Sequence, residues 1–281
     1  MIVRVPGTSA NLGPGYDCMG MAFKLYNDFH FEETDFMSEE DKESLMYKTV
    51  EFFYKENNLE APKLKITVDA NVPMTRGLGS SATCIDAALL FANEFSNLNL
   101  EKQKLLEYAT RIEGHPDNVL PAFLGGLVCA SYDDGLVYYK AEVSEKFKFT
   151  LLVADFAMET KLARRAVKDT LSLDHAISNI AKSNLIFQAM RIGDMDMLRK
   201  SAKDYIHEPY RKVLIEDYDM LKEIANKNES VLFISGAGSS LLVISDSNNK
   251  NIDTAFDNLE TKAKWRAINL EVDNDGAYIL R

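Results

Sequence analysis

The stretch "RGLGSSATCIDAALLFANEF", residues 76–95, places two glycines and two serines directly before an uninterrupted helical pattern. Gly77 and Gly79 permit positive φ and a close backbone approach, so successive amide groups can turn inward. Ser80 and Ser81 are favourable N-caps, and the helix that they open presents unpaired N–H groups with a partial positive charge. The stretch therefore predicts either an ordinary capped turn or a cradle for an anion such as phosphate. It is neither a GxxxxGK[ST] nor a GxGxxG motif.

The composition is that of a globular protein with ample core: 281 residues, 46% hydrophobic and 27% charged. The 43 acidic residues outnumber the 32 basic ones, and a net charge of −11 disfavours DNA or RNA as the main partner while allowing a small anion. Three cysteines without a CxxC pair and four scattered histidines indicate neither a disulfide framework nor a zinc site. Because the start of the chain lacks a signal-peptide pattern and no apolar run approaches the roughly 20 residues that span a bilayer, we expect a cytoplasmic protein without a membrane partner.

The order of strand-like and helix-like segments predicts an α+β fold with two domains, residues 1–148 and 149–281. Neither half shows the strict strand–helix alternation of a doubly wound parallel sheet, and an apolar strand restarts the pattern near Phe147. In the first half we expect a short strand at 2–6 followed by a glycine-rich loop through Gly20, strands at 21–33, 63–70 and near 126–132 and 135–141, and helices at 38–57 and 101–112. In the second half we expect two or three helices between Thr160 and Asn228, a strand–turn–strand at 230–245, a helix near 251–264 and closing strands through Leu280.

Two further glycine-containing segments favour the anion cradle over the plain turn. "PGTSANLGPGYD", residues 6–17, combines three glycines and two prolines with polar side chains, which is too elaborate for a simple turn. "SGAGSS", residues 235–240, lies between two apolar strands, where an ordinary β-hairpin is the alternative.

In their order and spacing these three segments resemble the signature motifs of the GHMP small-molecule kinases. "PMTRGLGSSAT", residues 73–83, matches the family's P-x-x-x-G-L-G-S-S-A at every defined position. The first segment, together with "EGHPDNVLPAFLGG" at 113–126, is similar to the homoserine kinase branch of the family, whose members phosphorylate homoserine on the route to threonine. The resemblance implies a ribosomal S5 domain 2-like N-terminal domain, a ferredoxin-like C-terminal domain, a homodimer, and ATP with its phosphates on residues 77–81. The implied nucleotide-binding residues are Pro73, Met74, Thr75, Arg76, Gly77, Leu78, Gly79, Ser80, Ser81, Ala82 and Thr83.

The resemblance also assigns catalytic roles. Ser81 and Glu113 would hold Mg²⁺, which prefers hard oxygen ligands; the alternative for Glu113 is a surface carboxylate that ends a helix. Asn118 would hold the acceptor hydroxyl. Asp117 aligns with an aspartate that is a base in some relatives, and its alternative is a buried structural carboxylate at a helix start. We interpret His115 as a structural histidine that orients this turn.

An amino-acid acceptor needs a cation for its carboxylate and an anion for its ammonium. Bidentate arginine suits a carboxylate, and the resemblance places Thr160 and Arg164 in a T-x-x-x-R element and Arg211 as a second carboxylate-binding arginine. Asp17 and Asn11 would take the ammonium group and adjacent polar atoms. The substrate that the resemblance implies is L-homoserine.

The sequence departs from the family pattern in three places, one of which is the short loop "EETDFMSEEDKE" at residues 32–43. Ser239 and Ser240 replace the usual Pro-Thr after the last glycine, and Ser44 stands where an asparagine usually helps to hold adenine. Two alternatives stay open: a GHMP kinase for another small alcohol, and a non-catalytic nucleotide-binding regulator. The paired arginines favour an amino acid over other alcohols, and the intact Ser81, Glu113 and Asp117 argue against the regulator.

Overall fold

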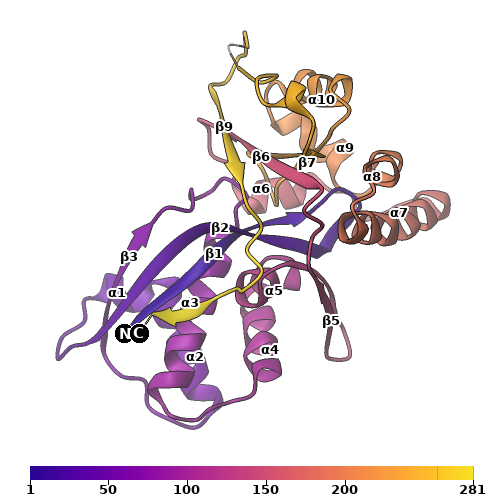
Figure 1. Ribbon diagram of the computed structural model, residues 1–281. Helices are drawn as coiled ribbons and strands as arrows, with labels where there is room; N and C mark the ends of the chain where they lie inside the picture. Colours follow the sequence, from indigo (N-terminus) through magenta and orange to yellow (C-terminus); the bar gives the residue numbers. More distant parts are fainter. Residues whose placement is uncertain (258, 281) are drawn as a thin grey trace.

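The computed structural model describes residues 1–257 and 259–280 and contains two antiparallel sheets with helices packed on them (Figure 1). The first sheet has the strand order β10-β1-β2-β4-β5, with β3 paired to β2, and the second has the order β7-β8-β6-β9. The strands are β1 (Ile2–Asn11), β2 (Gly15–Glu33), β3 (Leu64–Ala70), β4 (Leu127–Tyr132), β5 (Leu136–Ala141), β6 (Phe147–Ala154), β7 (Val231–Ile234), β8 (Leu241–Asp246), β9 (Trp265–Leu270) and β10 (Tyr278–Leu280). The helices are α1 (Glu39–Glu43), α2 (Leu45–Glu56), α3 (Ser80–Phe95), α4 (Lys102–Glu113), α5 (Pro116–Leu124), α6 (Thr160–Arg165), α7 (Leu173–Ile192), α8 (Met195–Ser201), α9 (Glu208–Arg211) and α10 (Tyr218–Lys227), with 3₁₀ turns at Lys212–Leu214 and Lys250–Ile252.

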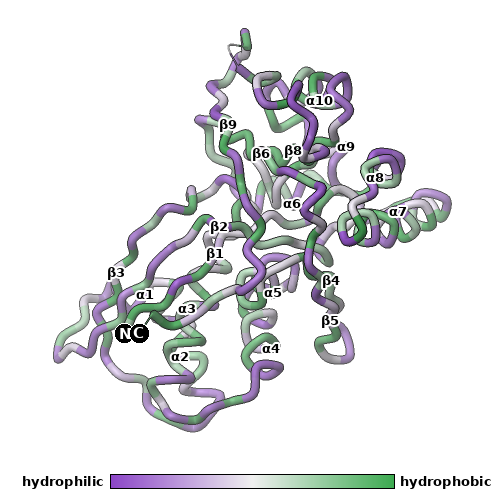
Figure 2. The backbone as a smooth tube through the Cα atoms, in the orientation of Figure 1, coloured by the Kyte–Doolittle hydropathy of each residue, from purple (hydrophilic) through white to green (hydrophobic). Residues whose placement is uncertain are grey.

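The first sheet carries α2, α3, α4 and α5 on one side (Figure 1). Val3 and Phe29 are directly paired on β1 and β2, and both are fully buried against these helices. On α3, Ile85 and Leu89 are spaced by one helical turn and face this core. Figure 2 shows many of the hydrophobic stretches along these inner strands and helices, whereas loop ends are largely hydrophilic. The alternation seen in the sequence thus becomes a sheet with one face covered by amphipathic helices.

The second sheet is covered by α7, α8 and α10. Phe149 of β6 and Phe233 of β7 pack with Ile186 of α7 in one buried cluster, and Leu221 of α10 belongs to another. Among the described residues, no helix has the length and apolar character needed to cross a bilayer. The expected α+β architecture is confirmed, and the strand–turn–strand prediction corresponds to β7 and β8.

The expected stop of the first strand at Pro6 is wrong. β1 continues to Asn11 and pairs with β2 along its length, with register shifts between Pro6 and Gly7 and between Ala10 and Asn11. The irregular pairing between Pro6 and Gly7 accommodates the proline, which has no N–H to donate. The loop predicted to run through Gly20 therefore shrinks to the short turn before Gly15.

Three helix predictions are also wrong. The helix expected at 38–57 is broken by Ser44, whose hydroxyl accepts a hydrogen bond from the Tyr47 N–H and caps α2. Between Thr160 and Asn228 there are five α-helices; α6, α8 and α9 are shorter than the window of about 11 residues over which a helical pattern is recognised, so the sequence did not separate them. Near 251–264, the described residues form only the 3₁₀ turn.

The final strand crosses back between the two halves of the chain. β10 pairs with β1, with Val3 opposite Ile279, and brings the two termini together (Figure 1). The division at residue 148 falls within β6, which starts the second sheet. The last residues in the sequence thus complete the sheet that the first residues began.

Candidate active site

A cleft of about 260 Å³ lies where all three glycine-containing segments meet, between the two sheets. Its walls come from the turn after β1, the loop before α3, the turn before α5, the start of α6 and the end of α9. The lining residues are Asn11, Asp17, Met74, Thr75, Gly77, Leu78, Gly79, Ser80, Ser81, Glu113, His115, Asp117, Asn118, Met158, Thr160, Arg164, Arg211, Gly236 and Ala237.

The loop before α3 has the left-handed backbone expected of its glycines, with φ of 73° at Gly77 and 66° at Gly79. A Cβ at Gly77 would lie 2.0 Å from the Ser235 carbonyl oxygen, and one at Gly79 would lie 2.0 Å from Thr8 Oγ1. Glycine is therefore needed both for the turn and for its contacts with the other two glycine segments. The loop is closely packed against both of these segments.

The prediction that Ser80 and Ser81 cap α3 is wrong: the N-cap is Gly79, and Ser80 is already the first helical residue. Among the described side chains, none caps this helix start by a hydrogen bond from the N-cap position. The first-turn N–H groups and the positive end of the helix dipole thus face the cleft without an internal acceptor. This is the arrangement that an anion completes.

The third segment supports the loop from behind. Ser235 Oγ lies 2.7 Å from the Gly77 carbonyl oxygen and donates to it, and the Ser240 N–H donates to the Arg76 carbonyl at 3.3 Å. Ser239, one of the two serines that replace the usual Pro-Thr, donates its hydroxyl to the Phe156 carbonyl at 2.6 Å. The serines at 239 and 240 are both fully buried, so they stabilise the loop rather than line the cleft.

Ser81 and Glu113 meet at the mouth of the loop. The Ser81 hydroxyl donates to Glu113 Oε2 at 3.0 Å. Burial raises the pKa of Glu113 above its ordinary value, against the opposing effects of the His115 charge and the Ser81 hydrogen bond. A hydroxyl and a carboxylate at this distance are a donor pair suited to a hard divalent cation.

The turn before α5 orients three polar side chains. His115 Nδ1 lies 2.6 Å from Asp117 Oδ1. Burial opposes the charged imidazolium, but the hydrogen bond and charge of Asp117 outweigh it and raise the pKa of His115. Asn118 Oδ1 accepts from the Thr8 hydroxyl at 2.8 Å, which leaves its Nδ2 hydrogens available to the cleft. Thr8 lies within the glycine-containing segment 6–17 but was not among the predicted site residues.

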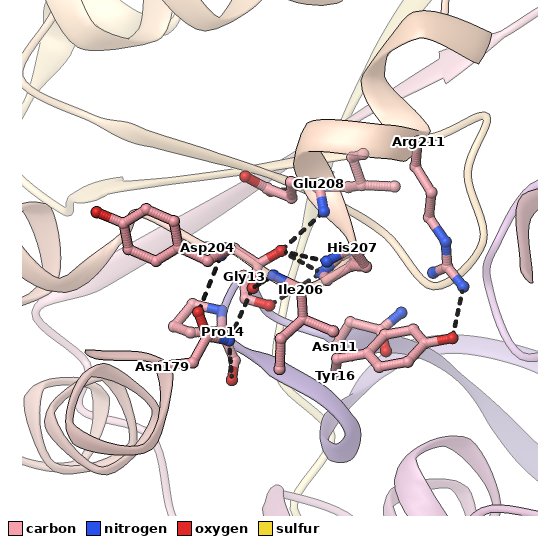
Figure 3. A network of polar contacts seen from close by, with 12 residues as sticks. Asn11, Gly13, Pro14, Tyr16, Asn179, Asp204, Ile206, His207, Glu208 and Arg211 are labelled. Carbon is pink, nitrogen blue, oxygen red and sulfur yellow. Dashed lines mark hydrogen bonds and ion pairs between the residues drawn. The ribbon is translucent and has the colours of Figure 1, made fainter. Parts of the chain in front are cut away.

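The far end of the cleft holds the two arginines over one aromatic ring. Arg164 makes a bidentate ion pair with Asp17, at 2.8 and 2.9 Å. Arg211 is only 2% exposed and donates to Ala163 O, Gly236 O and the Tyr16 hydroxyl, at 3.1, 3.0 and 3.2 Å (Figure 3). The Tyr16 ring centroid lies 5.7 Å from Arg164 Cζ and 4.8 Å from Arg211 Cζ.

Charge and burial act in opposite directions on these two guanidinium groups. The hydrogen bonds that Arg164 donates to Asp17 are the main cause that raises the pKa of Arg164, whereas burial lowers the pKa of Arg211. Asn11 holds the turn between them: its Nδ2 donates to Gly236 O at 2.7 Å and its Oδ1 accepts from the Asp17 N–H at 3.0 Å. Both ends of the Asn11 amide are thus engaged within the fold.

The structure brings together every predicted catalytic and substrate-binding residue, and most of the predicted nucleotide-binding ones. Pro73 and Arg76 line an adjacent hollow of about 430 Å³ with Lys264 and Trp265. Ala82 and Thr83 are fully buried and do not line the cleft. Their contribution is to the packing of α3.

Comparisons with known proteins agree with this geometry. Residues 44–126 match the GHMP kinases N terminal domain, and residues 186–261 match the GHMP kinases C terminal domain. The chain is 35% identical to a homoserine kinase of Caldicellulosiruptor saccharolyticus, covering 99% of this chain and 96% of that protein. It is 36% identical to a homoserine kinase of Clostridium botulinum, covering 99% and 97%. The crystal structure of homoserine kinase from Cytophaga hutchinsonii shares the fold, with a TM-score of 0.86, 23% identity and coverage of 100% and 97%.

Proposed function

The chain belongs to the GHMP kinase family, and we propose that it is a homoserine kinase, which transfers the γ-phosphoryl group of ATP to the side-chain hydroxyl of L-homoserine. The observation that carries the proposal is a single cleft with an uncapped helix start at one end and two arginines with an aspartate at the other. The first end suits a phosphate and the second suits a zwitterion. The halves divided near residue 148 would be the family's N- and C-terminal domains, with β10 returning to the first.

The phosphates of ATP would bind at the start of α3. The N–H groups of the first turn and the fixed loop at Gly77 and Gly79 suit closely approaching phosphate oxygens. Adenine would lie beyond the loop. Ser44 is already engaged as the cap of α2, so adenine recognition by that position is not expected to follow the usual family contact.

The donor atoms of Ser81 and Glu113 fit Mg²⁺. Their oxygens are 3.0 Å apart, and Glu113 is a carboxyl whose raised pKa reflects burial. A cation at this position would offset that burial, because it favours the ionised carboxylate. Mg²⁺, when bound, would supply neutralisation of the phosphate charge.

The acceptor would replace an ion pair that the protein makes with itself. The ammonium group of homoserine would take Asp17, and its carboxylate would take Arg164 and Arg211. Each charged group that is released from the Asp17–Arg164 pair thereby gains a new partner of opposite charge. An alcohol that carries only one of the two charges would separate Asp17 from Arg164 and leave one of these side chains unpaired, which costs free energy. This exchange explains how the site would prefer an amino acid.

The reaction forms a bond between the acceptor oxygen and the γ-phosphorus and breaks the bond to ADP, and the acceptor proton is released. Asn118 is placed to hold the acceptor oxygen through Nδ2, because Thr8 fixes its Oδ1. Asp117 is already engaged, since its Oδ1 lies 2.6 Å from His115 Nδ1. A loose phosphoryl transition state leaves the attacking hydroxyl nearly neutral until late, so we infer that Asp117 and His115 position the turn.

We further propose a homodimer. Leu173, Ile177 and Ile180 are spaced along one side of α7 and are 74%, 57% and 66% exposed, and Val137 on the edge strand β5 is 73% exposed. Contiguous exposed apolar side chains on a helix that is also buried on its other side are typical of a subunit contact. Sedimentation velocity tests this proposal. We expect the wild-type chain to sediment as a dimer and the Ile180→Lys variant as a monomer, and a wild-type chain that sediments as a monomer would contradict the proposal.

The experiment that tests the function is ADP release measured with ATP, Mg²⁺ and a panel of acceptors. The panel contains L-homoserine, L-serine, L-threonine, 4-hydroxybutyrate, which lacks the ammonium group, and mevalonate. We expect turnover with L-homoserine and little with 4-hydroxybutyrate. Preferred turnover of mevalonate or another alcohol would refute the homoserine assignment and favour another kinase of this family, and binding of ATP without turnover of any acceptor would favour a regulator.

A further inference from the structure

A buried polar network connects α9 to the turn between β1 and β2 (Figure 3). Asp204, which is 3% exposed, accepts hydrogen bonds from the backbone N–H groups of Ile206, His207 and Glu208, at 3.0, 2.7 and 2.7 Å. It also accepts from Asn179 Nδ2 at 2.8 Å. Asp204 therefore supplies the acceptor for the start of α9, the helix that ends with Arg211.

His207 makes the connection across the domains. It is fully buried, and its Nε2 lies 2.9 Å from the Gly13 carbonyl oxygen. Because a carbonyl only accepts, Nε2 carries the hydrogen, and among the described residues Nδ1 has no hydrogen-bond partner. Burial lowers the pKa of His207, in agreement with a neutral ring. Asn179 adds a second, longer contact to the same turn, 3.4 Å from Nδ2 to the Pro14 carbonyl.

The turn that His207 holds is conformationally costly. Three successive residues, Asn11, Leu12 and Gly13, have positive φ values of 73°, 44° and 70°. For non-glycine residues this region is strained, and it persists only where the surroundings fix it. The turn then leads directly into Tyr16, whose ring stacks on His207 with centroids 5.2 Å apart and an interplanar angle of 21°.

Tyr16 passes this constraint to the arginines. The Tyr16 ring stacks on His207. Both Arg164 and Arg211 lie within cation–π distance of this ring, and the Tyr16 hydroxyl accepts a hydrogen bond from Arg211. A shift of the turn would move Tyr16 and with it the anchoring of Arg211. The network thus acts on the part of the cleft that would receive the acceptor, and the N–H groups at the start of α3 lie outside it.

We propose that Asp204 and His207 are positioning residues for acceptor recognition, which hold the Gly13–Tyr16 turn against α9 and so fix Tyr16 and Arg211 in the geometry that receives the acceptor's carboxylate. This inference rests on the proposed function and extends it to residues that do not line the cleft. A role confined to general stability would affect the acceptor and the nucleotide alike, whereas positioning affects the acceptor alone.

The test compares His207→Leu, which removes the N–H donor, with His207→Gln, whose side-chain amide can still reach Gly13. We expect His207→Leu to raise the KM for L-homoserine about tenfold or more, since a buried carbonyl loses its donor. The KM for ATP and kcat should stay within about twofold, and His207→Gln should recover most of the loss. His30→Leu is the matched control, because His30 lies on β2, contacts Asp69 of β3 and does not line the cleft, and it should leave all three constants unchanged.

The outcomes separate the two proposals. A wild-type enzyme that does not phosphorylate L-homoserine refutes the proposed function, and this inference falls with it. An active wild type with unchanged homoserine KM in His207→Leu, or with equal losses for homoserine and ATP, overturns the inference alone. If His207→Leu does not fold, His207→Asn replaces it, since its shorter amide cannot reach Gly13; equal homoserine KM values for the Asn and Gln variants then overturn the inference.

Discussion

Asp86 is a fully buried carboxyl on α3 that has no hydrogen-bond partner on either oxygen among the described residues. Burial first, and the Glu113 charge second, raise the pKa of Asp86 well above its ordinary value of 3.8. The folded chain therefore keeps a proton that the unfolded chain releases once the pH exceeds the ordinary value. Because the native state binds more protons, the free energy of unfolding falls as the pH rises from that value to the folded-state pKa.

Asp86→Asn removes this titration while nearly preserving shape. Its unfolding free energy relative to the wild type should rise by about 1.4 kcal/mol per pH unit and level off at the folded-state pKa of Asp86. The unfolding free energy of the variant, relative to that of the wild type, should therefore be more favourable at neutral pH than at acidic pH, even though the amide that replaces the Asp86 carboxyl has no hydrogen-bond partner.

The measurement is urea unfolding, followed by circular dichroism, at a series of pH values between about 5 and 8. Glu94→Gln, at an exposed position of the same helix, is the control and should run parallel to the wild type. If the Asp86→Asn and wild-type curves are parallel over this range, Asp86 does not hold a proton in the folded state and the reasoning is refuted.

Four further outcomes are expected from the cleft residues. Glu113→Gln and Ser81→Ala should each lower kcat about tenfold or more at saturating Mg²⁺, and wild-type turnover of Glu113→Gln would remove Glu113 from the site. A protonated carboxyl does not bind a cation, and the pKa of Glu113 is raised above 4.5. As the pH falls, the apparent Mg²⁺ affinity should therefore begin to weaken at a higher pH than it would with an ordinary glutamate. A Mg²⁺ titration of initial rates at several pH values checks this. Arg164→Ala and Arg211→Ala should weaken homoserine binding by about 1.5–3 kcal/mol with ATP binding intact, and unchanged homoserine KM in both would count against an amino-acid acceptor. Asn118→Ala should lower kcat more than Asp117→Asn, and a folded Asp117→Asn that binds both substrates yet turns over about a thousandfold more slowly would establish Asp117 as a base.

Several features of this protein could be predicted from short stretches of sequence. The positive φ at Gly77 and Gly79, the strand–turn–strand around SGAGSS and the helix that starts at Ser80 all depend on the conformational preferences of a few adjacent residues. The resemblance to the GHMP kinases rests on the same local patterns, and it predicted most of the residues that line the cleft. Local requirements of this kind are fixed by backbone sterics and helix periodicity, so they can be read without knowledge of the fold.

Local sequence gave no indication of which distant groups pair with one another. Arg164 meets Asp17 across 147 positions, Thr8 meets Asn118 across 110, and His207 meets Gly13 across 194. The role of His207 depends on the carbonyl of Gly13, which no pattern of side chains in the sequence indicates. These contacts follow from the order of strands in two sheets and from the return of β10 to β1. Loop closure over such separations is decided by the packing of the whole chain, so only the tertiary structure determines them.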